Sequence, residues 1–485
     1  MFDIVIIGCG IIGAATAYEL AKYNISVAVL EKENDVAVAA TKANSAIIHA
    51  GYDPAHGSLM AALNVEGATL AKALCQALDV PYIQCGALVL AFSREEAKAL
   101  QRLLENGVAN GVEGLCILDR TEVLRREPGV GENVVAALYA PSTAIVSPWE
   151  YGLALAETAV KNGVTLHTGC EVTAITRAAQ GFTLQTTQGD IHAKGVINAA
   201  GLYADKVHNM LGAENGKAFA IQPDRGEYFL LDKSEGSRVK HVVFQAPSRV
   251  GKGVLVAPTV HGNLIVGPNS EGAVAADNVA TTAAGLGFVK SLARKSAPDI
   301  DFSANIRNFA GNRAKSDRQD FIIEESAPGF INLAGIASPG LSAAPAIAKM
   351  AVGLLKNSGI PLTKPLTKKE NFTATRRRLR FHYLSRETKA ALTAQDPAYA
   401  AVVCRCETVT EGEIRDALQA PIPPKSVDGV KRRCHAGSGR CQGGFCSPKV
   451  VEMLAAHYEC SPLDILQDGG GTHILAYEMG GERGE

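Results

Sequence analysis

Three glycines near the amino terminus have the spacing of a chain that binds the pyrophosphate of a dinucleotide. Gly8, Gly10 and Gly13 lie in the sequence GCGIIG, directly after the apolar run of residues 2–7. In such a turn the first glycine allows a tight bend, the second admits the phosphates to the backbone, and the third lets a helix pack on the strand. Glu31 follows about twenty residues later, where an acid binds ribose hydroxyls and repels a 2′-phosphate. The stretch therefore predicts a dinucleotide site, and an ordinary turn with incidental glycines is the alternative.

Four cysteines near the carboxyl terminus form two close pairs that could bind metal through sulfur. The pairs are Cys404 with Cys406 and Cys441 with Cys446. The first pair is too close for the CxxC knuckle of a zinc ribbon, and the glycines nearby would free backbone N–H groups to bond cluster sulfurs. An iron-sulfur cluster is the favoured prediction, with structural zinc and free thiols as alternatives. A fifth thiol, Cys434, is expected not to be a ligand.

The glycine turn requires a strand before it, a helix after it and a second strand that ends at the acid. Residues 2–7 are apolar and rich in Ile, which predicts a buried parallel strand. Residues 12–23 are expected to form the helix and residues 26–30 the second strand. The sequence therefore predicts a βαβ unit in which the amino end of the helix faces the phosphates.

The composition is that of a soluble enzyme of several domains. The chain has 485 residues, of which 47% are hydrophobic and 20% charged, with a net charge of −1 and a pI of about 6.8. This balance gives no basic surface for nucleic acid, and eleven cysteines favour reduced thiols or metal ligands over a disulfide framework. The first strand begins at residue 2, and no apolar run is long enough to cross a membrane. We expect a cytoplasmic protein, or one held at the membrane surface through a partner.

Further segments are expected to complete an α/β architecture around the same ligand. The small residues of 41–52 would let the backbone lie against a flat ring, and 196–205 is a second buried strand that leads into a glycine turn. Strands and turns alternate over 219–266, which predicts an antiparallel sheet inserted as a wall over the ligand. A strand at 330–335 leads through a glycine-rich loop into a helix at 343–357, whose amino end suits an anion.

Two kinds of side chain are candidates for contact with a substrate. His49 could touch the ring of the cofactor or a substrate hydroxyl, and a histidine satisfied by a turn is the alternative. Arg313 is the favoured anion-binding residue, because the sequence FAGNR places a glycine and an arginine just before the last strand. The basic residues in or beside the inserted sheet are Arg225, Arg249, Lys252, Arg307 and Arg313.

Three separated pieces of the chain together resemble the D-amino-acid-oxidase-type superfamily of FAD-dependent oxidoreductases. The pieces are residues 1–51, 165–205 and 305–355. Within the superfamily the chain resembles the anaerobic-type glycerol-3-phosphate dehydrogenases and the L-2-hydroxyglutarate oxidases and dehydrogenases. The segments that carry this closer likeness are Asn44 to Ser58, Asn198 to Asp205, Arg225 to Tyr228 and Gly311 to Arg313.

The resemblance implies an FAD cofactor with a substrate over its ring. It implies oxidation of a secondary alcohol by hydride transfer, in which a base removes the hydroxyl proton and an arginine binds the anionic end. The residues implied beside the substrate are His49, Tyr228 and Arg313. The residues implied for FAD are Gly8, Gly10, Ile12, Gly13, Glu31, Lys32, Asn44, Ser45, Val172, Ala200, Gly201, Gly335, Gly340 and Leu341.

The cysteine-bearing end resembles the bacterioferritin-associated-ferredoxin type of domain, which also ends the large subunit of anaerobic glycerol-3-phosphate dehydrogenase. This likeness implies a [2Fe-2S] cluster on Cys404, Cys406, Cys441 and Cys446. The expected fold is α/β, with a Rossmann-like FAD-binding domain, an inserted antiparallel-sheet substrate domain and a small helical [2Fe-2S] domain. The expected bounds are 1–85, 145–215 and 305–358 for the first, 86–144 and 216–304 for the second, 359–400 for a linker and 401–470 for the third.

The function that these resemblances imply is a dehydrogenase that passes electrons through the cluster to an acceptor protein subunit. Glycerol 3-phosphate is the expected small anionic substrate and L-2-hydroxyglutarate the second choice. An electron-transfer flavoprotein subunit without a substrate of its own is the third hypothesis. Lys431, Arg432 and Arg433 are expected to form a docking face for an acidic partner.

Overall fold

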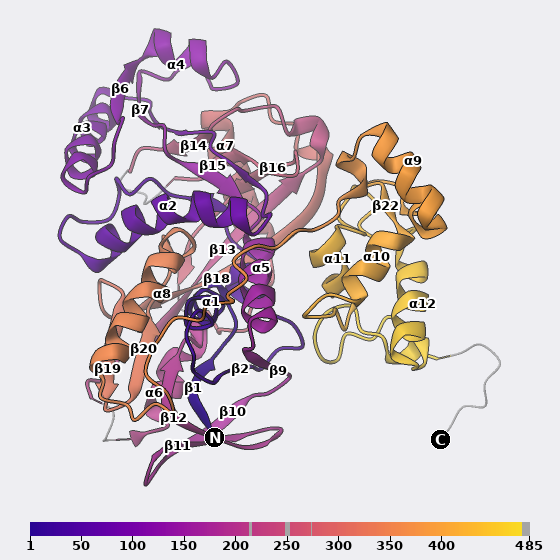
Figure 1. The fold of residues 1–485 in the computed structure, drawn as a ribbon. Coiled ribbons are helices and arrows are strands. Elements are labelled where there is room, and N and C mark those ends of the chain that lie inside the picture. Colours follow the sequence, from indigo (N-terminus) through magenta and orange to yellow (C-terminus); the bar gives the residue numbers. More distant parts are fainter. Residues whose placement is uncertain (213–215, 248–252, 273, 478–485) are drawn as a thin grey trace. The chain divides into compact units, whose positions relative to one another are not determined.

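The computed structural model describes two units, each compact by its own contacts. One unit contains Met1–Leu30 and Ala37–Arg376, and the other contains Glu31–Val36 and Arg377–Glu485. The main division thus falls inside the predicted linker, and a short turn near the amino terminus belongs to the second unit (Figure 1). The structure describes residues 1–212, 216–247, 253–272 and 274–477, so that Arg249 and Lys252 lie outside the described residues.

The first sheet is built around β1 (Phe2–Ile7), which pairs in parallel on both sides. Its neighbours are β2 (Val27–Glu31) and β12 (Gly189–Asn198), and β20 (Phe330–Ala334) pairs in parallel with the far end of β12. Residues 3–7 are buried, as expected for a parallel strand covered on both faces. The predicted strand at residues 2–7 is confirmed. The remaining strands of this sheet are β9 (Thr165–Thr168), β10 (Val172–Ala178), β11 (Gly181–Thr186) and β19 (Ile322–Ala327).

Four helices pack together beside this sheet. Helix α1 (Ile11–Leu20) lies against α5 (Pro148–Lys161) and α8 (Gly340–Asn357), and α2 (Leu59–Ala77) lies along α8 (Figure 1). The close approach of α2 requires Gly67, because a Cβ there would lie 2.2 Å from the carbonyl oxygen of Ser342. Helix α1 is shorter than the predicted span of 12–23. The helical hydrogen bonds end near Ala21, and Tyr23 instead forms a bridge with a later segment of the chain.

The second sheet is dominated by one long antiparallel pair. Strand β13 (Ile221–Leu231) runs beside β18 (Asn305–Ser316), in a register from Ile221 opposite Ser316 to Leu231 opposite Asn305. Residues 305–316 therefore belong to this sheet, whereas the sequence placed them with the FAD-binding domain. The sheet is also not wholly antiparallel, because β14 (Val242–Gln245) pairs in parallel with β5 (Ala87–Ala91). Its other strands are β6 (Cys116–Asp119), β7 (Ala136–Ala140), β15 (Leu255–Pro258), β16 (Leu264–Gly267) and β17 (Glu271–Gly272).

Helices cover the second sheet, and a small third sheet follows the first glycine turn. Helix α7 (Ala283–Ser296) contacts β13, β14, β15 and β16, and α3 (Arg94–Ala109) contacts β5, β6 and β7. The third sheet contains β3 (Ile47–Ile48), β4 (Tyr82–Ile83) and β8 (Ala144–Val146). Strand β3 is directly followed by His49, so this sheet fixes the position of the histidine backbone.

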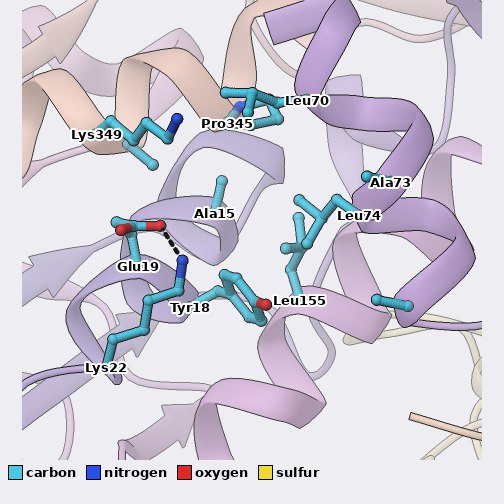
Figure 2. Close-up of a pocket in the computed structure, with 12 residues that line it drawn as sticks. Ala15, Tyr18, Glu19, Lys22, Leu70, Ala73, Leu74, Leu155, Pro345 and Lys349 are labelled. Carbon is cyan, nitrogen blue, oxygen red and sulfur yellow. Dashed lines mark hydrogen bonds and ion pairs between the residues drawn. The ribbon is translucent and has the colours of Figure 1, made fainter. Parts of the chain in front are cut away.

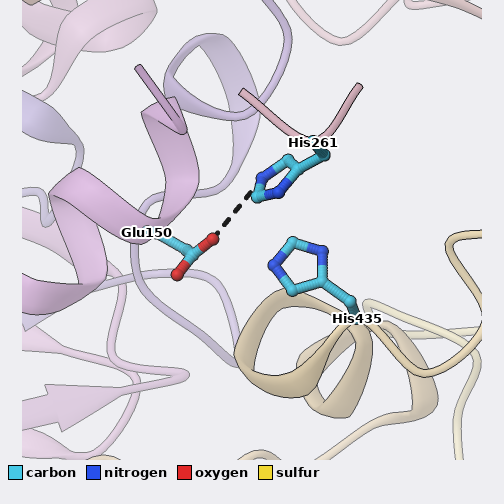
Figure 3. Close-up of side chains that lie close together, drawn as sticks. All are labelled: Glu150, His261 and His435. Carbon is cyan, nitrogen blue, oxygen red and sulfur yellow. Dashed lines mark ion pairs between the residues drawn. The ribbon is translucent and has the colours of Figure 1, made fainter. Parts of the chain in front are cut away.

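An ion pair connects helix α5 to a turn of the second sheet. Figure 3 shows the ring of His261, which precedes β16, facing the carboxylate of Glu150 in the first turn of α5. His261 Nε2 lies 3.5 Å from Glu150 Oε1, and the ring of His261 stacks on Trp149 with 5.8 Å between centroids. Glu150 is fully buried, and His261 is one of the groups that face its carboxylate.

Residues 359–376, here called the strap, have little regular structure but are bonded along their length to the first unit. Thr363 donates to Asp3 through its backbone N–H and its hydroxyl, at 2.6 and 2.7 Å. Phe372 meets the edge of the Tyr18 ring, and Arg376 pairs with the buried Glu157 at 2.6 Å. The strap therefore completes the first unit.

The second unit is a small bundle of short helices with one two-stranded hairpin. Buried Ile414, Val430 and Leu454 form the centre of its core. Among the described residues, no helix of either unit combines the length and the apolar character needed to cross a membrane. The elements of the second unit are α9 (Arg386–Gln395), β21 (Val402–Cys404), β22 (Val409–Thr410), α10 (Glu411–Leu418), α11 (Val427–Cys434) and α12 (Ser447–Tyr458).

Asp3 connects β1, the start of β2 and the strap, which generates a prediction about stability. Burial raises the pKa of Asp3, but hydrogen bonds from Ser26 and Thr363 outweigh it, so the pKa lies below its usual value. The stabilisation is then present above about pH 4 and is lost as the pH falls toward the lowered pKa. Asp3→Asn should lower the free energy of unfolding by about 1–3 kcal/mol at pH 7.

The measurement is urea unfolding of both proteins at pH 7 and near pH 3, below the pKa of an unfolded-state aspartate, where the difference should shrink. Asp190→Asn, which removes an exposed acid from β12, is the matched control and should change little. Equal stability of wild type and Asp3→Asn at pH 7 would contradict the role given to Asp3.

Candidate functional site

The first glycine turn has the shape that its sequence predicts. Gly8 has a φ of +95°, and a Cβ on it would lie 2.6 Å from the carbonyl oxygen of Ala199. A Cβ on Gly13 would lie 1.9 Å from the carbonyl oxygen of Gly8, so only glycine lets α1 pack this closely on the turn. Gly10 precedes the first turn of α1, which contains Ile12. The amino end of α1 therefore stands at the carboxyl edge of the sheet, as binding of a pyrophosphate requires.

The acid predicted to bind ribose lies at the end of β2. Glu31 is buried, and its Oε1 accepts a hydrogen bond from the backbone N–H of Glu33 at 3.0 Å. The shape of the turn after the strand thus fixes the carboxylate. Lys32 is exposed, and its Nζ lies 3.5 Å from Glu33 Oε1, so its side chain forms a surface ion pair rather than a buried contact.

The loop after the 3-10 turn at residues 39–41 holds two more predicted FAD residues. The Asn44 amide donates to the carbonyls of Ala40 and Thr41 at 3.1 and 2.8 Å, and it accepts from the N–H of Ala46 at 2.7 Å. Asn44 therefore shapes the loop, because its polar atoms are used within it. Ser45 points out of the loop, and its hydroxyl lies 3.3 Å from that of Tyr228.

The second and third glycine turns stand near the first. Ala200 and Gly201 follow β12 directly, and Gly201 has a φ of +55°. Val172 belongs to the same buried cluster as Ile7 and Leu30, which places it beside the ends of β1 and β2. The turn before α8 contains Gly335, Gly340 and Leu341, and Gly335 has a φ of +64°.

His49 meets the first turn of α8. Its backbone N–H donates to the hydroxyl of Ser342 at 2.7 Å, and its ring lies 5.9 Å from the ring of Phe244. Ser342 is fully buried in the first turn of α8. Sequence reasoning missed both Ser342 and Phe244. A hydroxyl directly after the predicted Gly-Leu pair was the available signal for Ser342, and none existed for Phe244.

Three polar side chains meet across the second sheet. Tyr228 links the hydroxyl of Ser45 to Arg313, whose guanidinium also pairs with Asp224 and donates to the carbonyl of Asn269 at 3.2 Å. Gly226 makes room for this group, because a Cβ there would lie 2.5 Å from Arg313 Nη2. The structure therefore brings Tyr228 and Arg313 together as predicted residues, with Ser45 beside them.

Asp224 was also missed, although strand alternation places it on the same face as Tyr228. Positions 224, 226 and 228 of a strand face the same side, and Asp224 lies directly opposite Arg313 in the register. Burial raises the pKa of Asp224, but Lys315, Ser270 and Arg313 outweigh it, so the carboxyl stays ionised. Burial lowers the pKa of Arg313, while Tyr228 and Asp224 raise it above its usual value. The pair is therefore held charged.

The four predicted cysteine ligands come together in the second unit. Cys406 Sγ lies 3.6 Å from Cys441 Sγ, and Cys404 forms a hydrogen bond with Cys446 at the amino end of α12. That bond lowers the pKa of the Cys404 thiol to about 6 against the opposing effect of burial. Backbone N–H groups of Gly437 and Glu407 also reach Cys404, and those of Gly443 and Phe445 reach Cys441. Four thiols with N–H donors to sulfur fit a [2Fe-2S] cluster.

The contacts of Cys434 support the prediction that it is not a ligand. Its thiol donates to the carbonyl of Val430 one turn back in α11 at 3.3 Å, and burial raises its pKa to about 11. The predicted docking face beside it is wrong. Arg432 and Arg433 are only 7% and 2% exposed, and they form buried ion pairs with Asp35, so neither can receive a partner.

A separate cavity of about 260 Å³ lies among α1, α2, α5 and α8 and contains none of the predicted site residues. Figure 2 shows Leu70 and Leu74 facing Tyr18 across it, with Lys22 bonded to Glu19 at one side. Its lining is mostly apolar and carries no glycine turn and no arginine. The chemistry of the site is therefore not located there.

Together the fold and the two sites define a flavin-dependent oxidoreductase that carries a sulfur-ligated cluster. The chain belongs to the FAD dependent oxidoreductase family, whose model matches residues 3–354. The BFD-like [2Fe-2S] binding domain matches residues 402–456. The predictions of FAD and of a [2Fe-2S] cluster are thereby confirmed, whereas the roles of single residues toward each group stay predictions.

The known proteins similar to the chain include enzymes that act on glycerol 3-phosphate and on L-2-hydroxyglutarate. A glycerol 3-phosphate dehydrogenase of Caloramator mitchellensis is 48% identical over 98% of both chains. The structure of an L-alpha-glycerophosphate oxidase from Mycoplasma pneumoniae with FAD bound has a TM-score of 0.72 and 32% identity, over 77% of this chain and 98% of that one. An L-2-hydroxyglutarate dehydrogenase of Salmonella houtenae is 36% identical, over 56% of this chain and 64% of that protein.

The arrangement of the cysteines predicts which substitution removes the cluster. Cys446→Ser should abolish bound iron and acid-labile sulfide, because it removes one of four converging thiolates. Cys434→Ala is the matched control and should keep both, since its thiol bonds to Val430 inside a helix. Iron and sulfide are measured on protein purified without oxygen. Loss of iron from both variants, or from neither, would show that the ligand set is different.

Proposed function

We propose that this chain oxidises sn-glycerol 3-phosphate to dihydroxyacetone phosphate and passes the electrons to an acceptor protein. The observation that carries this proposal is the 48% identity to a glycerol 3-phosphate dehydrogenase over 98% of both chains. A match of that extent includes the cysteine-bearing unit, which the solved oxidase, matching only 77% of this chain, does not share in full. The proposal is therefore a dehydrogenase rather than an oxidase.

Arg313 is the residue that we assign to the phosphate of the substrate. Its guanidinium is oriented by Asp224 and by the Asn269 carbonyl, and the planar fork suits an oxygen-rich anion. Tyr228 and Ser45 add two hydroxyl groups beside it at a separation of 3.3 Å. Arg313 and Tyr228 bind and orient the substrate, with the anion at one end and the reacting carbon toward the loop at residues 41–46, in which Ser45 is assigned to FAD.

His49 is assigned as the base that takes the proton of the substrate hydroxyl. Its backbone is fixed by β3 and by the bond to Ser342, and its ring rests against Phe244. When bound, FAD supplies the hydride acceptor, and the [2Fe-2S] cluster supplies a carrier of single electrons. The residues that we assign to FAD are those of the three glycine turns, with Glu31, Asn44, Ser45 and Val172.

A second candidate substrate is L-2-hydroxyglutarate. The observation that favours it is the 36% identity to an L-2-hydroxyglutarate dehydrogenase, and Arg313 suits a carboxylate as well as a phosphate. That match spans 64% of the other protein and 56% of this chain, so it supports the chemistry of a secondary alcohol more than the identity of its anion. We place it second.

The proposed partner is a one-electron acceptor protein that docks where the cluster would come nearest to solvent. Cys406 is the one exposed residue among the four cysteines, and Phe445, directly before Cys446, is 85% exposed. Arg405 and Arg440 are exposed beside these cysteines. An apolar side chain with basic neighbours suits an acidic electron carrier.

The proposed function predicts which compounds reduce the flavin. Without oxygen, sn-glycerol 3-phosphate should bleach the flavin absorbance of the purified protein at far lower concentration than L-2-hydroxyglutarate. Cys446→Ser should keep this half-reaction and lose transfer to an acidic one-electron carrier such as a flavodoxin, with Cys460→Ser as the control. If L-2-hydroxyglutarate bleaches the flavin at lower concentration, it is the substrate in place of sn-glycerol 3-phosphate. Undiminished transfer by Cys446→Ser would refute the route through the cluster.

The role of Arg313 predicts a change in KM more than in kcat. Arg313→Lys should raise the KM for sn-glycerol 3-phosphate about tenfold or more, because a single ammonium cannot replace the two-pronged contact, and Arg313→Ala should raise it further. Arg307→Lys, on the same strand β18 but exposed, is the matched control. Steady-state kinetics with each variant provide the measurement. A KM unchanged in both Arg313 variants would assign the anion to another basic residue.

A further inference from the structure

A buried carboxylate lies in the turn that follows the proposed ribose-binding acid. Asp35 is 3% exposed and belongs, with residues 31–36, to the second unit. Its Oδ2 accepts from Arg432 Nε and Nη2 at 3.0 and 2.8 Å and from Arg433 Nη1 at 2.9 Å, and its Oδ1 accepts from Arg433 Nη2 at 2.9 Å. The guanidinium groups of Arg432 and Arg433 therefore both bind the carboxylate of Asp35.

Both arginines also bond to other groups of the second unit. Arg432 Nη1 pairs with Asp468 at 2.8 Å, and Arg433 donates to the carbonyls of Ile422 and Gly429 at 2.8 and 3.0 Å. Asp35 and Asp468 thus balance two buried positive charges. Removal of one partner from such a network leaves an uncompensated buried charge, which is far more costly than loss of a surface ion pair.

The same arginines stand directly before the cluster ligands. Both lie in the last turn of α11, which ends at Cys434, and the chain then turns at His435 with a φ of +64°. Gly437, two residues later, gives its backbone N–H to Cys404. The position of α11 therefore affects the loop that leads to the cysteines.

The segment of residues 31–36, which contains Asp35, begins with Glu31. The carboxylate of Glu31 accepts from the backbone N–H of Glu33, two residues before Asp35. The amide of Asn34 also donates to the backbone carbonyl of Asp468, which provides a second connection of the turn to the carboxyl-terminal part of the unit. A change at Asp35 would release the backbone that orients Glu31.

We infer that Asp35 is a positioning residue for FAD, through which the cysteine-bearing unit sets the carboxylate that binds the ribose. This inference rests on the proposed role of Glu31 and does not depend on the identity of the substrate. Because coupling free energies are reciprocal, binding of FAD also stabilises α11 and the loop to the cluster ligands. FAD affinity and the order of the cluster domain are therefore linked in this chain.

The test begins with FAD titration of flavin-free full-length protein, followed by quenching of flavin fluorescence. Asp35→Asn and Glu31→Gln should each raise the Kd for FAD at least tenfold. The double variant should bind scarcely worse than Glu31→Gln alone, because Asp35 acts through Glu31. Asp428→Asn removes another acid from α11 that touches no arginine of the pair, and it should leave the affinity unchanged.

A second measurement needs no variant and so does not depend on how Asp35→Asn folds. Addition of FAD to the wild-type protein should slow hydrogen exchange of the amides at residues 427–434. Two results would overturn the inference: additive losses in the double variant, or no change of exchange in α11 on binding FAD. An unchanged affinity of Glu31→Gln for FAD would also overturn the inference, because it assumes that Glu31 binds the ribose. The discovery of a different substrate would not affect the inference.

Discussion

The contact between Gly13 and the carbonyl of Gly8 is the constraint on which the flavin-binding half depends. It brings α1 close to β1, and the neighbouring carbonyl of Ala199 then fixes β12 beside the same turn. Since β1, β2, β12 and β20 run in parallel, their carboxyl ends meet at one edge, where three glycine turns and Glu31 gather. A side chain at either glycine would push α1 away from β1 and move apart the groups that gather at that edge.

Strand β18 of the second sheet packs closely against the loop beside this edge. Gly311 of β18 lies so close to the loop at residues 41–46 that a Cβ would approach the carbonyl of Ala43 to 1.9 Å. Because β13 pairs with β18 along its length, the position of Gly311 also determines the positions of Tyr228 and Arg313. The hydroxyl of Ser45 and the guanidinium of Arg313 are thus positioned by backbone contacts rather than by their own neighbours in sequence.

Local spacing predicted the parts of the molecule that depend on local geometry. The glycines of the first turn and the four cysteines could be found from the sequence, because the chemistry of each needs residues a few positions apart. Asp224 opposite Arg313 depends on a register across about ninety residues, which no local pattern encodes, and the parallel pairing of β5 with β14 is equally remote. Arg432 and Arg433 were misread because a sequence shows charge but not burial. The two arginines can be buried because Asp35, about four hundred positions away, pairs with both of them, and Asp468 pairs with Arg432.

The strap extends the flavin-binding unit beyond the end of the family match. That match stops at residue 354, yet Asp3, Tyr18 and Glu157 find partners in residues 363–376. A protein shortened at residue 354 would expose an aromatic ring and leave a buried acid without its cation, whereas one that ends at residue 376 would keep these contacts. The smallest part of the chain that can be separated as a flavin-binding piece is therefore longer than its family boundary.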